Sequence, residues 1–250
     1  MAKKIKSQEF GVGDLLCEGW RIYRSNFKEI LIVILCVYIP INIIFAFFPA
    51  DSILQESGRN GLGLKIYNYI VNLLEFIIGI IAIMGIAKIT ENAIEGQSLV
   101  WSDAIKYALS KWGNAIGTGL LSGLILFGLT LLFFIPGIIY SLYYTFWIFA
   151  VTLRDRSGKE ALDYSKNLVK GQWWNVFGIQ LVLGLIAMVA QLVIYPINLI
   201  SKNPIFGILP NTLSDIIGSF FTITSVLFFL NNDYTYRHPP EVKIQPMEIL

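Results

Sequence analysis

Residues 113–151 read GNAIGTGLLSGLILFGLTLLFFIPGIIYSLYYTFWIFAV and contain no charged side chain. A transmembrane helix needs about 20 mostly apolar residues to cross a hydrocarbon core about 30 Å thick. The stretch is long enough for two crossings, and the Pro136-Gly137 pair favours a reversal of the chain between them. It therefore predicts a tight hairpin of two membrane-spanning helices, over 114–136 and 137–153.

The composition of the whole chain agrees with a membrane protein. Hydrophobic residues make up 55% of the 250 residues and charged residues 14%, whereas a soluble domain carries roughly 25% charged residues. The formal net charge of +2 is too small to indicate a nucleic-acid partner, so we expect the lipid bilayer to surround most of the protein. Two cysteines, Cys17 and Cys36, and one histidine, His238, indicate no disulfide framework, no metal site and no cofactor.

Apolar runs elsewhere in the chain complete an all-α, polytopic fold. We predict six transmembrane helices in a single membrane domain over 1–232, followed by an extended cytoplasmic tail over 233–250. The six predicted spans cover 29–49, 66–88, 114–136, 137–153, 175–199 and 212–231.

The distribution of basic residues predicts the orientation. Of the 19 lysines and arginines, all but Arg59, Lys65 and Lys202 fall on the side that holds both termini. Basic residues accumulate on the cytoplasmic side of a membrane, so both termini are predicted to be cytoplasmic. The first apolar run begins only near Glu29, so we expect no cleaved signal peptide.

A charged amphipathic stretch precedes each odd-numbered span, within 13–35, 102–125 and 159–186. In each, apolar residues recur at helical spacing opposite charged ones, which is typical of a helix that lies in the plane of the membrane surface. The sequence therefore predicts a threefold repeat of interfacial helix, span and span on the cytoplasmic side. The predicted interfacial anchors are aromatic: Trp20, Phe27, Trp101, Trp112, Trp173 and Trp174.

The pair Trp173-Trp174 follows a Lys-Gly step at the end of the third amphipathic stretch. Gly171 suits the left-handed turn that commonly ends a helix, and tryptophan is enriched at the headgroup level of membranes. We interpret the pair as an anchor at a helix corner, and a ligand platform is the alternative.

Three segments resemble a known family: GWRIYRSNF (19–27), IPGIIYSLYYTFWIFAV (135–151) and ALDYSKNLVKGQWWNVFG (161–178). Together they are similar to the bacterial six-span membrane-domain family named after glycerophosphodiester phosphodiesterase, and to related multi-spanning families of unknown function. The resemblance covers about residues 10–232. It implies a six-span, multi-pass protein of the bacterial cytoplasmic (plasma) membrane and little about activity. The enzymatic name is not carried over, because the catalytic barrel of the enzymes is a separate soluble domain.

Two polar stripes run through the predicted spans. Asn68, Asn72 and Glu75 share one face of the second span, with Glu75 near mid-membrane. A carboxyl group at that depth is costly and suggests an ion, proton or substrate path; the alternative is a glutamate that holds helices together by hydrogen bonds.

The sixth span carries the matching stripe of Asp215, Ser219 and Thr222, and Gln180 and Gln191 of the fifth span could face the same interior. Convergence of these side chains would form a polar interior. The alternative is that the hydroxyl groups bond to their own backbone and let helices pack closely. Glycines at four-residue spacing in the third span (Gly113, Gly117, Gly119 and Gly123) predict a helix-packing face, within the monomer or in a homo-oligomer.

No predicted span contains a histidine or an interior lysine that could activate a nucleophile. We therefore expect a non-enzymatic integral membrane protein that binds or regulates other membrane components, its partner being a lipid or another membrane protein. The alternative is a small transporter or lipid-handling protein with a polar interior around Glu75. An intramembrane enzyme is the remote third hypothesis.

Overall fold

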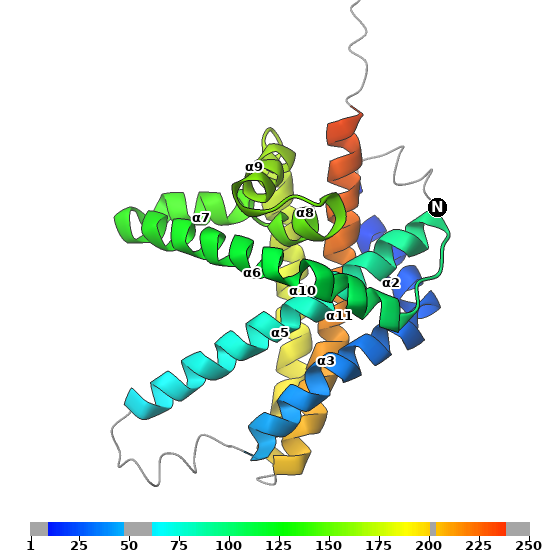
Figure 1. Ribbon diagram of the computed structural model, residues 1–250, viewed down its shortest axis with the longest axis vertical. Coiled ribbons are helices and arrows are strands. Elements are labelled where there is room, and N and C mark those ends of the chain that lie inside the picture. The colour runs from blue at the N-terminus through cyan, green and yellow to red at the C-terminus, as the bar shows by residue number, and fades with distance from the viewer. Residues whose placement is uncertain (1–9, 48–61, 201–203, 239–250) are drawn as a thin grey trace, which may run out of the picture.

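The computed structural model describes residues 10–47, 62–200 and 204–238, which form helices and no strand (Figure 1). The predicted all-α class is confirmed for these residues. In chain order the helices are α2 (Val12–Ser25), α3 (Phe27–Phe47), α5 (Leu62–Glu95), α6 (Trp101–Leu132), α7 (Phe134–Tyr143), α8 (Trp147–Arg154), α9 (Gly158–Val169), α10 (Trp173–Ile200) and α11 (Pro204–Arg237).

Several helical stretches are long and apolar enough to cross a membrane. Among the described residues there are five: Lys65–Glu95, Trp101–Leu132, Phe134–Arg154, Trp173–Ile194 and Pro210–Arg237. The pair Val12–Ser25 and Phe27–Ile43 adds a sixth if it is taken as one span bent by 81°. The protein is therefore a helical membrane protein by length and composition, and the arrangement of six crossings stays a prediction.

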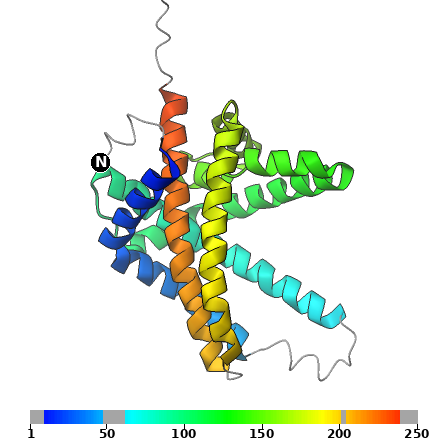
Figure 2. The ribbon, with the colours of Figure 1, turned by 180° about the vertical axis from the view of Figure 1, so that it is seen from behind.

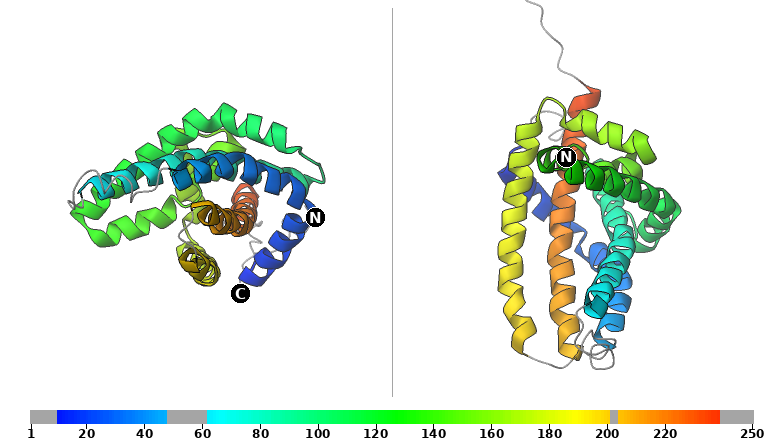
Figure 3. Two further views of the ribbon diagram at one scale, coloured as in Figure 1. Left: turned by 90° about the horizontal axis from the view of Figure 1, so that it is seen from below. Right: turned by 90° about the vertical axis from the view of Figure 1, so that its left-hand side faces the viewer.

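Helix α11 lies at the centre of the fold and packs against α2, α3, α5 and α10. Helices α10 and α11 run side by side along the long axis, while α3 and α5 cross them obliquely (Figures 1 and 2). The α6–α7 hairpin projects sideways from this group, as the left view of Figure 3 also shows. The apolar core holds fully buried side chains such as Ile30, Ile80, Phe146 and Phe228.

The hairpin reverses earlier than the sequence predicted. Helix α6 ends at Leu132, Phe133 is extended, and α7 begins at Phe134, so the boundary at residues 136 and 137 was wrong. Pro136 lies in the first turn of α7, where a missing N–H costs no helical hydrogen bond. Gly137 instead lets the two helices approach, because a Cβ there would lie 3.1 Å from the Cα of Thr130 and overlap its hydroxyl.

The return segment of the hairpin, predicted as one span over 137–153, is broken between α7 and α8. Ser165 of α9 bridges the break: its hydroxyl donates to the carbonyl of Tyr143 at 2.8 Å and accepts from the N–H of Phe146 at 3.0 Å. Since backbone groups at a helix break need partners, the fully buried Ser165 stabilises both helix ends.

Two of the three predicted interfacial helices are separate helices. Helix α2 bends away from α3 at Asn26, and α9 ends before α10 at Gly171, whose φ of +89° confirms the predicted left-handed turn. The second predicted interfacial helix, within 102–125, is not a separate helix, because α6 runs unbroken from Trp101 to Leu132. This prediction was wrong. Trp112 donates its indole N–H to the carbonyl of Ile77 on α5 at 2.8 Å, and a bend at this point would break that bond.

Helix α11 continues to Arg237 and so includes the first five residues of the predicted extended tail, 233–237. The continuation buries Asp233, which is fully inaccessible to solvent and pairs with a cation on another helix. The rest of the predicted tail, over 239–250, lies outside the described residues.

Candidate functional site

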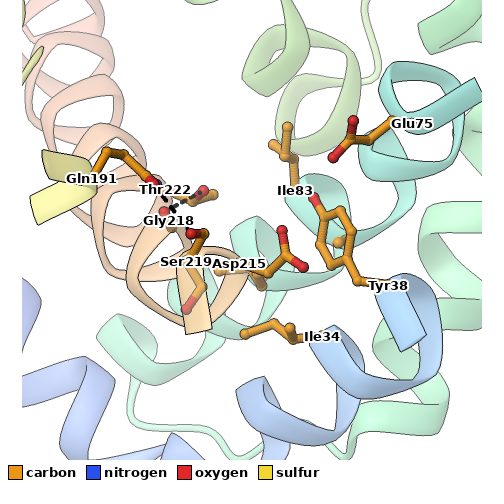
Figure 4. Close-up of a pocket in the computed structure, with 12 residues that line it drawn as sticks. Ile34, Tyr38, Glu75, Ile83, Gln191, Asp215, Gly218, Ser219 and Thr222 are labelled. Atoms are coloured by element: carbon orange, nitrogen blue, oxygen red, sulfur yellow. Dashed lines mark hydrogen bonds between the residues drawn. The ribbon is translucent and has the colours of Figure 1, made fainter. Parts of the chain in front are cut away.

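A polar groove of about 320 Å³ lies between α3, α5, α10 and α11 (Figure 4). Five of the residues predicted for a polar interior line it: Glu75, Gln191, Asp215, Ser219 and Thr222. Tyr38 and Ser214 add further polar groups, and Ile34, Ile83 and Ile86 supply apolar walls. Glu75 of the second predicted span and the stripe of the sixth therefore meet in one groove.

Asp215 is fixed in position by an amide that the sequence analysis did not single out. Asn42 of α3, which is only 5% exposed, donates from Nδ2 to Asp215 Oδ2 at 3.2 Å and to Thr212 Oγ1 at 3.4 Å. An amide among the apolar residues of the first predicted span is the same kind of signal as Asn72 in the second, and it could have been found in the same way.

Glu75 is exposed, and Figure 4 shows its carboxylate pointing from α5 toward the groove. Within the described part of the chain it makes no hydrogen bond or ion pair. In the same view the ring of Tyr38 lies between Glu75 and Asp215. Gly79, one turn after Glu75, makes room for this ring, because a Cβ at Gly79 would lie 3.1 Å from the Tyr38 hydroxyl.

Some hydroxyl groups of the groove are already satisfied locally, as the packing interpretation expects. Ser219 donates to the carbonyl of Ile216 at 2.6 Å and Thr222 to that of Gly218 at 3.3 Å. Ser214 donates to Gln191 Oε1 at 3.1 Å and so ties α11 to α10. The hydroxyl groups of these side chains already donate to protein acceptors. The carboxylates of Glu75 and Asp215 are therefore the groups of the groove able to bind a ligand strongly.

Three residues of the predicted polar interior do not line the groove. Gln180 donates to the hydroxyl of Thr145, at the break between α7 and α8, at 3.3 Å. Asn72 is exposed on α5 outside the groove, and the side chain of Asn68 lies outside the described residues. The predicted 4-3 spacing places Asn68 and Asn72 on the same helix face as Glu75, but the described α5 residues that line the groove run from Glu75 to Ile86.

The charged side chains that line the groove are all acidic among the described residues. Glu75 and Asp215 are acidic, and no lysine, arginine or histidine is found among the described residues that line it. The described residues also contain no group of three or more histidine, cysteine or acidic side chains placed to hold a metal ion. The arrangement is therefore suited to a single positive charge or to several hydrogen-bond donors.

A second polar feature, which we call the ionic cluster, joins the ends of α5, α8 and α11. The Arg154 guanidinium binds Glu91 Oε1 at 2.7 Å and Asp233 Oδ2 at 2.6 Å. Lys88 also pairs with Glu91, at 2.9 Å, and Arg237 pairs with Asp233. The Asp233 side chain is 1% exposed, so its charge depends on these partners.

Tyr164 connects α9 to the ionic cluster by donating its hydroxyl to Asp233 Oδ1. Burial, together with this carboxylate, raises the pKa of Tyr164 to about 12, so the phenol stays a neutral donor near pH 7. The sequence analysis missed the ionic cluster. Glu91, Arg154 and Asp233 each follow the end of a predicted span on the side predicted to be cytoplasmic, but the sequence does not show that they meet.

A family model matches residues 60–236, which is more than half of the chain. The chain belongs to the family described as Domain of unknown function (DUF7847). Nothing among the curated proteins and nothing among the solved structures matches the chain. A link to the membrane domain of glycerophosphodiester phosphodiesterases is not shown by these comparisons.

The DUF7847 region holds Glu91, Arg154 and Asp233 of the ionic cluster and both groove carboxylates, whereas Tyr38 and Asn42 precede it and Arg237 follows it. It also holds the predicted glycine face, most of which is not closely packed against the rest of the described residues. A Cβ added at Gly113, Gly117 or Gly123 would meet nothing within 4 Å, and only Gly119 packs closely, at 3.1 Å from Trp147. Packing within the monomer therefore explains only Gly119 among the four glycines. The other three lie on faces of α6 that point away from the bundle.

The predicted aromatic anchors divide into two groups. Trp20 (57% exposed), Phe27 and Trp174 (77% exposed) present large apolar surfaces outward. Trp101, Trp112 and Trp173 are only partly exposed, and all three pack against the core. Trp173 stacks on Phe177 with ring centroids 5.5 Å apart, and it closes the α9–α10 corner beside Trp174.

Proposed function

We propose that this protein binds a membrane component that carries a positively charged group, without chemically changing it, and that the polar groove is the binding site. The observation that supports this most directly is the exposed carboxylate of Glu75. It makes no hydrogen bond or ion pair with the described residues, and it shares with Asp215 a groove lined by no cation of those residues. A carboxylate within an apolar span is costly unless it gains a partner, and a cationic ligand would supply one.

The shape and chemistry of the groove support an amphiphilic ligand. Its volume of about 320 Å³ is within the range of small-molecule sites. Asp215, held by Asn42, and Glu75 could accept hydrogen bonds from an ammonium group, while Ile34, Ile83 and Ile86 could contact an alkyl chain. We place this site in the bacterial cytoplasmic membrane, with both termini in the cytoplasm.

Binding is tested with purified protein in a neutral detergent and three probes of equal chain length: octylammonium, octanol and octyl sulfate. We expect octylammonium alone to raise the midpoint of thermal unfolding. Glu75→Gln and Asp215→Asn should each weaken its binding at least about tenfold, since a hydrogen bond to a charged group contributes roughly 1.5–3 kcal/mol. The matched control is Glu95→Gln, an exposed glutamate on the same helix outside the groove.

Equal effects of octylammonium and octanol, or full binding by both groove variants, would contradict the proposal. If the protein is instead a transporter, it must also carry the bound ligand across the membrane. Liposomes containing the protein should then release trapped octylammonium faster than liposomes containing Glu75→Gln. Binding without faster release identifies a binding protein that does not transport.

A further inference from the structure

A second hollow, of about 420 Å³, lies beside the α9–α10 corner and apart from the polar groove. It is lined by Tyr143 of α7, by Asp163, Lys166 and Asn167 of α9, and by Lys170 just after α9. We call it the lysine hollow. Neither the ionic cluster nor the proposed function explains its two lysines.

These lysines differ from the cations around them. Arg154, Arg156 and Arg237 each pair with a carboxylate. Lys166 and Lys170, in contrast, have no carboxylate within ion-pair distance among the described residues. The Lys166 ammonium is nevertheless held in place, because it lies over the rings of Tyr140 and Tyr143, at 5.2 and 6.0 Å from their centroids.

We propose that the lysine hollow binds the phosphate group of an anionic phospholipid. Lys166 and Lys170 would supply two ammonium groups, and the Asn167 amide and the Tyr143 hydroxyl would supply further hydrogen-bond donors. Asp163 lines the same hollow and opposes an anion. A phosphodiester with a single charge is therefore a better match than a phosphomonoester with two.

The surroundings of the hollow favour a lipid over a free phosphate. Trp174, at the adjoining corner, is 77% exposed, and Trp173 donates to the carbonyl of Ile139 at 3.5 Å, which joins α10 to α7. Ile138 and Ile139, just before the tyrosines on α7, expose apolar surface. A headgroup in the lysine hollow would thus lie at the level of interfacial tryptophans, with apolar surface beside it for acyl chains.

The experiment compares phosphatidylglycerol with phosphatidylcholine on the full chain in a neutral detergent, counting bound lipids by native mass spectrometry. Wild type should retain phosphatidylglycerol preferentially. Lys166→Gln and Lys170→Gln should each weaken its binding about fivefold, and Asp163→Asn should strengthen it. The matched control is Lys159→Gln, an exposed lysine on α9 outside the hollow. An unchanged thermal midpoint shows that each variant is folded.

Competition with glycerol 3-phosphate separates the lipid from a soluble phosphate. Retention of phosphatidylglycerol in a large excess of glycerol 3-phosphate supports the lipid, and displacement would overturn that assignment in favour of a soluble phosphate. Equal losses in Lys159→Gln and Lys166→Gln, or no preference of wild type for phosphatidylglycerol, would overturn the site itself. None of these outcomes depends on the carboxylates of the polar groove.

Discussion

Arg154 binds Asp233 through two of its guanidinium nitrogens, Nη2 at 2.6 Å and Nε at 3.0 Å. The contact joins the last residue of α8 to the C-terminal end of α11, 79 positions later in the chain. Because Asp233 is almost wholly buried, its carboxylate has lost the hydration it would have in water. The guanidinium has taken the place of that water.

Replacing Arg154 with methionine should destabilise the protein strongly. The variant leaves Asp233 with one remaining cation, Arg237, whose side chain is half-exposed, and the loss of a buried partner costs about 3–5 kcal/mol. The expected result is a large fall in the midpoint of thermal unfolding of the purified protein. Arg21→Met, which removes an exposed ion pair with Glu18, should cost less than about 1 kcal/mol; equal effects of the two changes would refute this account.

Gly137→Ala should disrupt the α6–α7 hairpin, because the new methyl group would overlap the Thr130 side chain and press on its Cα. We expect a loss of about 1–3 kcal/mol, as for other overpacked contacts. Gly128→Ala is the comparison, since nothing lies within 4 Å of a Cβ at that position. This second change should stabilise the helix by about 0.5–1 kcal/mol. Thermal unfolding of the two variants should therefore shift in opposite directions.

Trp112→Phe should weaken the contact between α5 and α6 while leaving an aromatic ring in place. It removes the indole N–H that donates to Ile77, for an expected loss of about 0.5–1.5 kcal/mol. Trp174→Phe removes an indole that is 77% exposed and should leave stability in detergent nearly unchanged. If Trp112 is only an interfacial anchor, both variants will unfold at the same temperature.

The predicted topology can be tested by labelling single cysteines in a Cys17→Ala/Cys36→Ala background. Ser98→Cys, in the exposed connection between α5 and α6, should react with a membrane-impermeant maleimide only from the cytoplasmic side. Asn211→Cys, exposed near the other end of α11, should react in intact cells. Labelling of both positions from one side would exclude the three crossings that are predicted between them.

The features that depend on local chemistry were predictable from the sequence. Gly171 adopts the left-handed conformation expected of a residue that ends a helix, and helical spacing placed Asp215, Ser219 and Thr222 on one groove-facing side of α11. Features that depend on a partner far along the chain were not predictable in this way. Arg154 resembles any basic residue at a membrane surface until α5 and α11 bring Glu91 and Asp233 to it.

The missing bend in α6 has the same origin. The residues around Trp112 resemble those at the corner before Trp173, and Gly113 could have ended a helix there. In the structure the Trp112 indole binds the carbonyl of Ile77 on a different helix, a contact that favours the straight course of α6. A repeat in the amphipathic pattern thus predicts which faces are apolar, but the location of a bend depends on which neighbour each repeat meets.

Helices α5 and α11 each carry one carboxylate of the groove and one of the ionic cluster. Glu75 and Glu91 are separated by roughly 24 Å along α5, and Asp215 and Asp233 by roughly 27 Å along α11, at 1.5 Å per residue. Each helix is unbroken over that distance and acts as a stiff rod. Arg154 holds the two helices together at one end through its ion pairs with Glu91 and Asp233. A ligand that moved the helices apart at the groove would therefore strain these ion pairs.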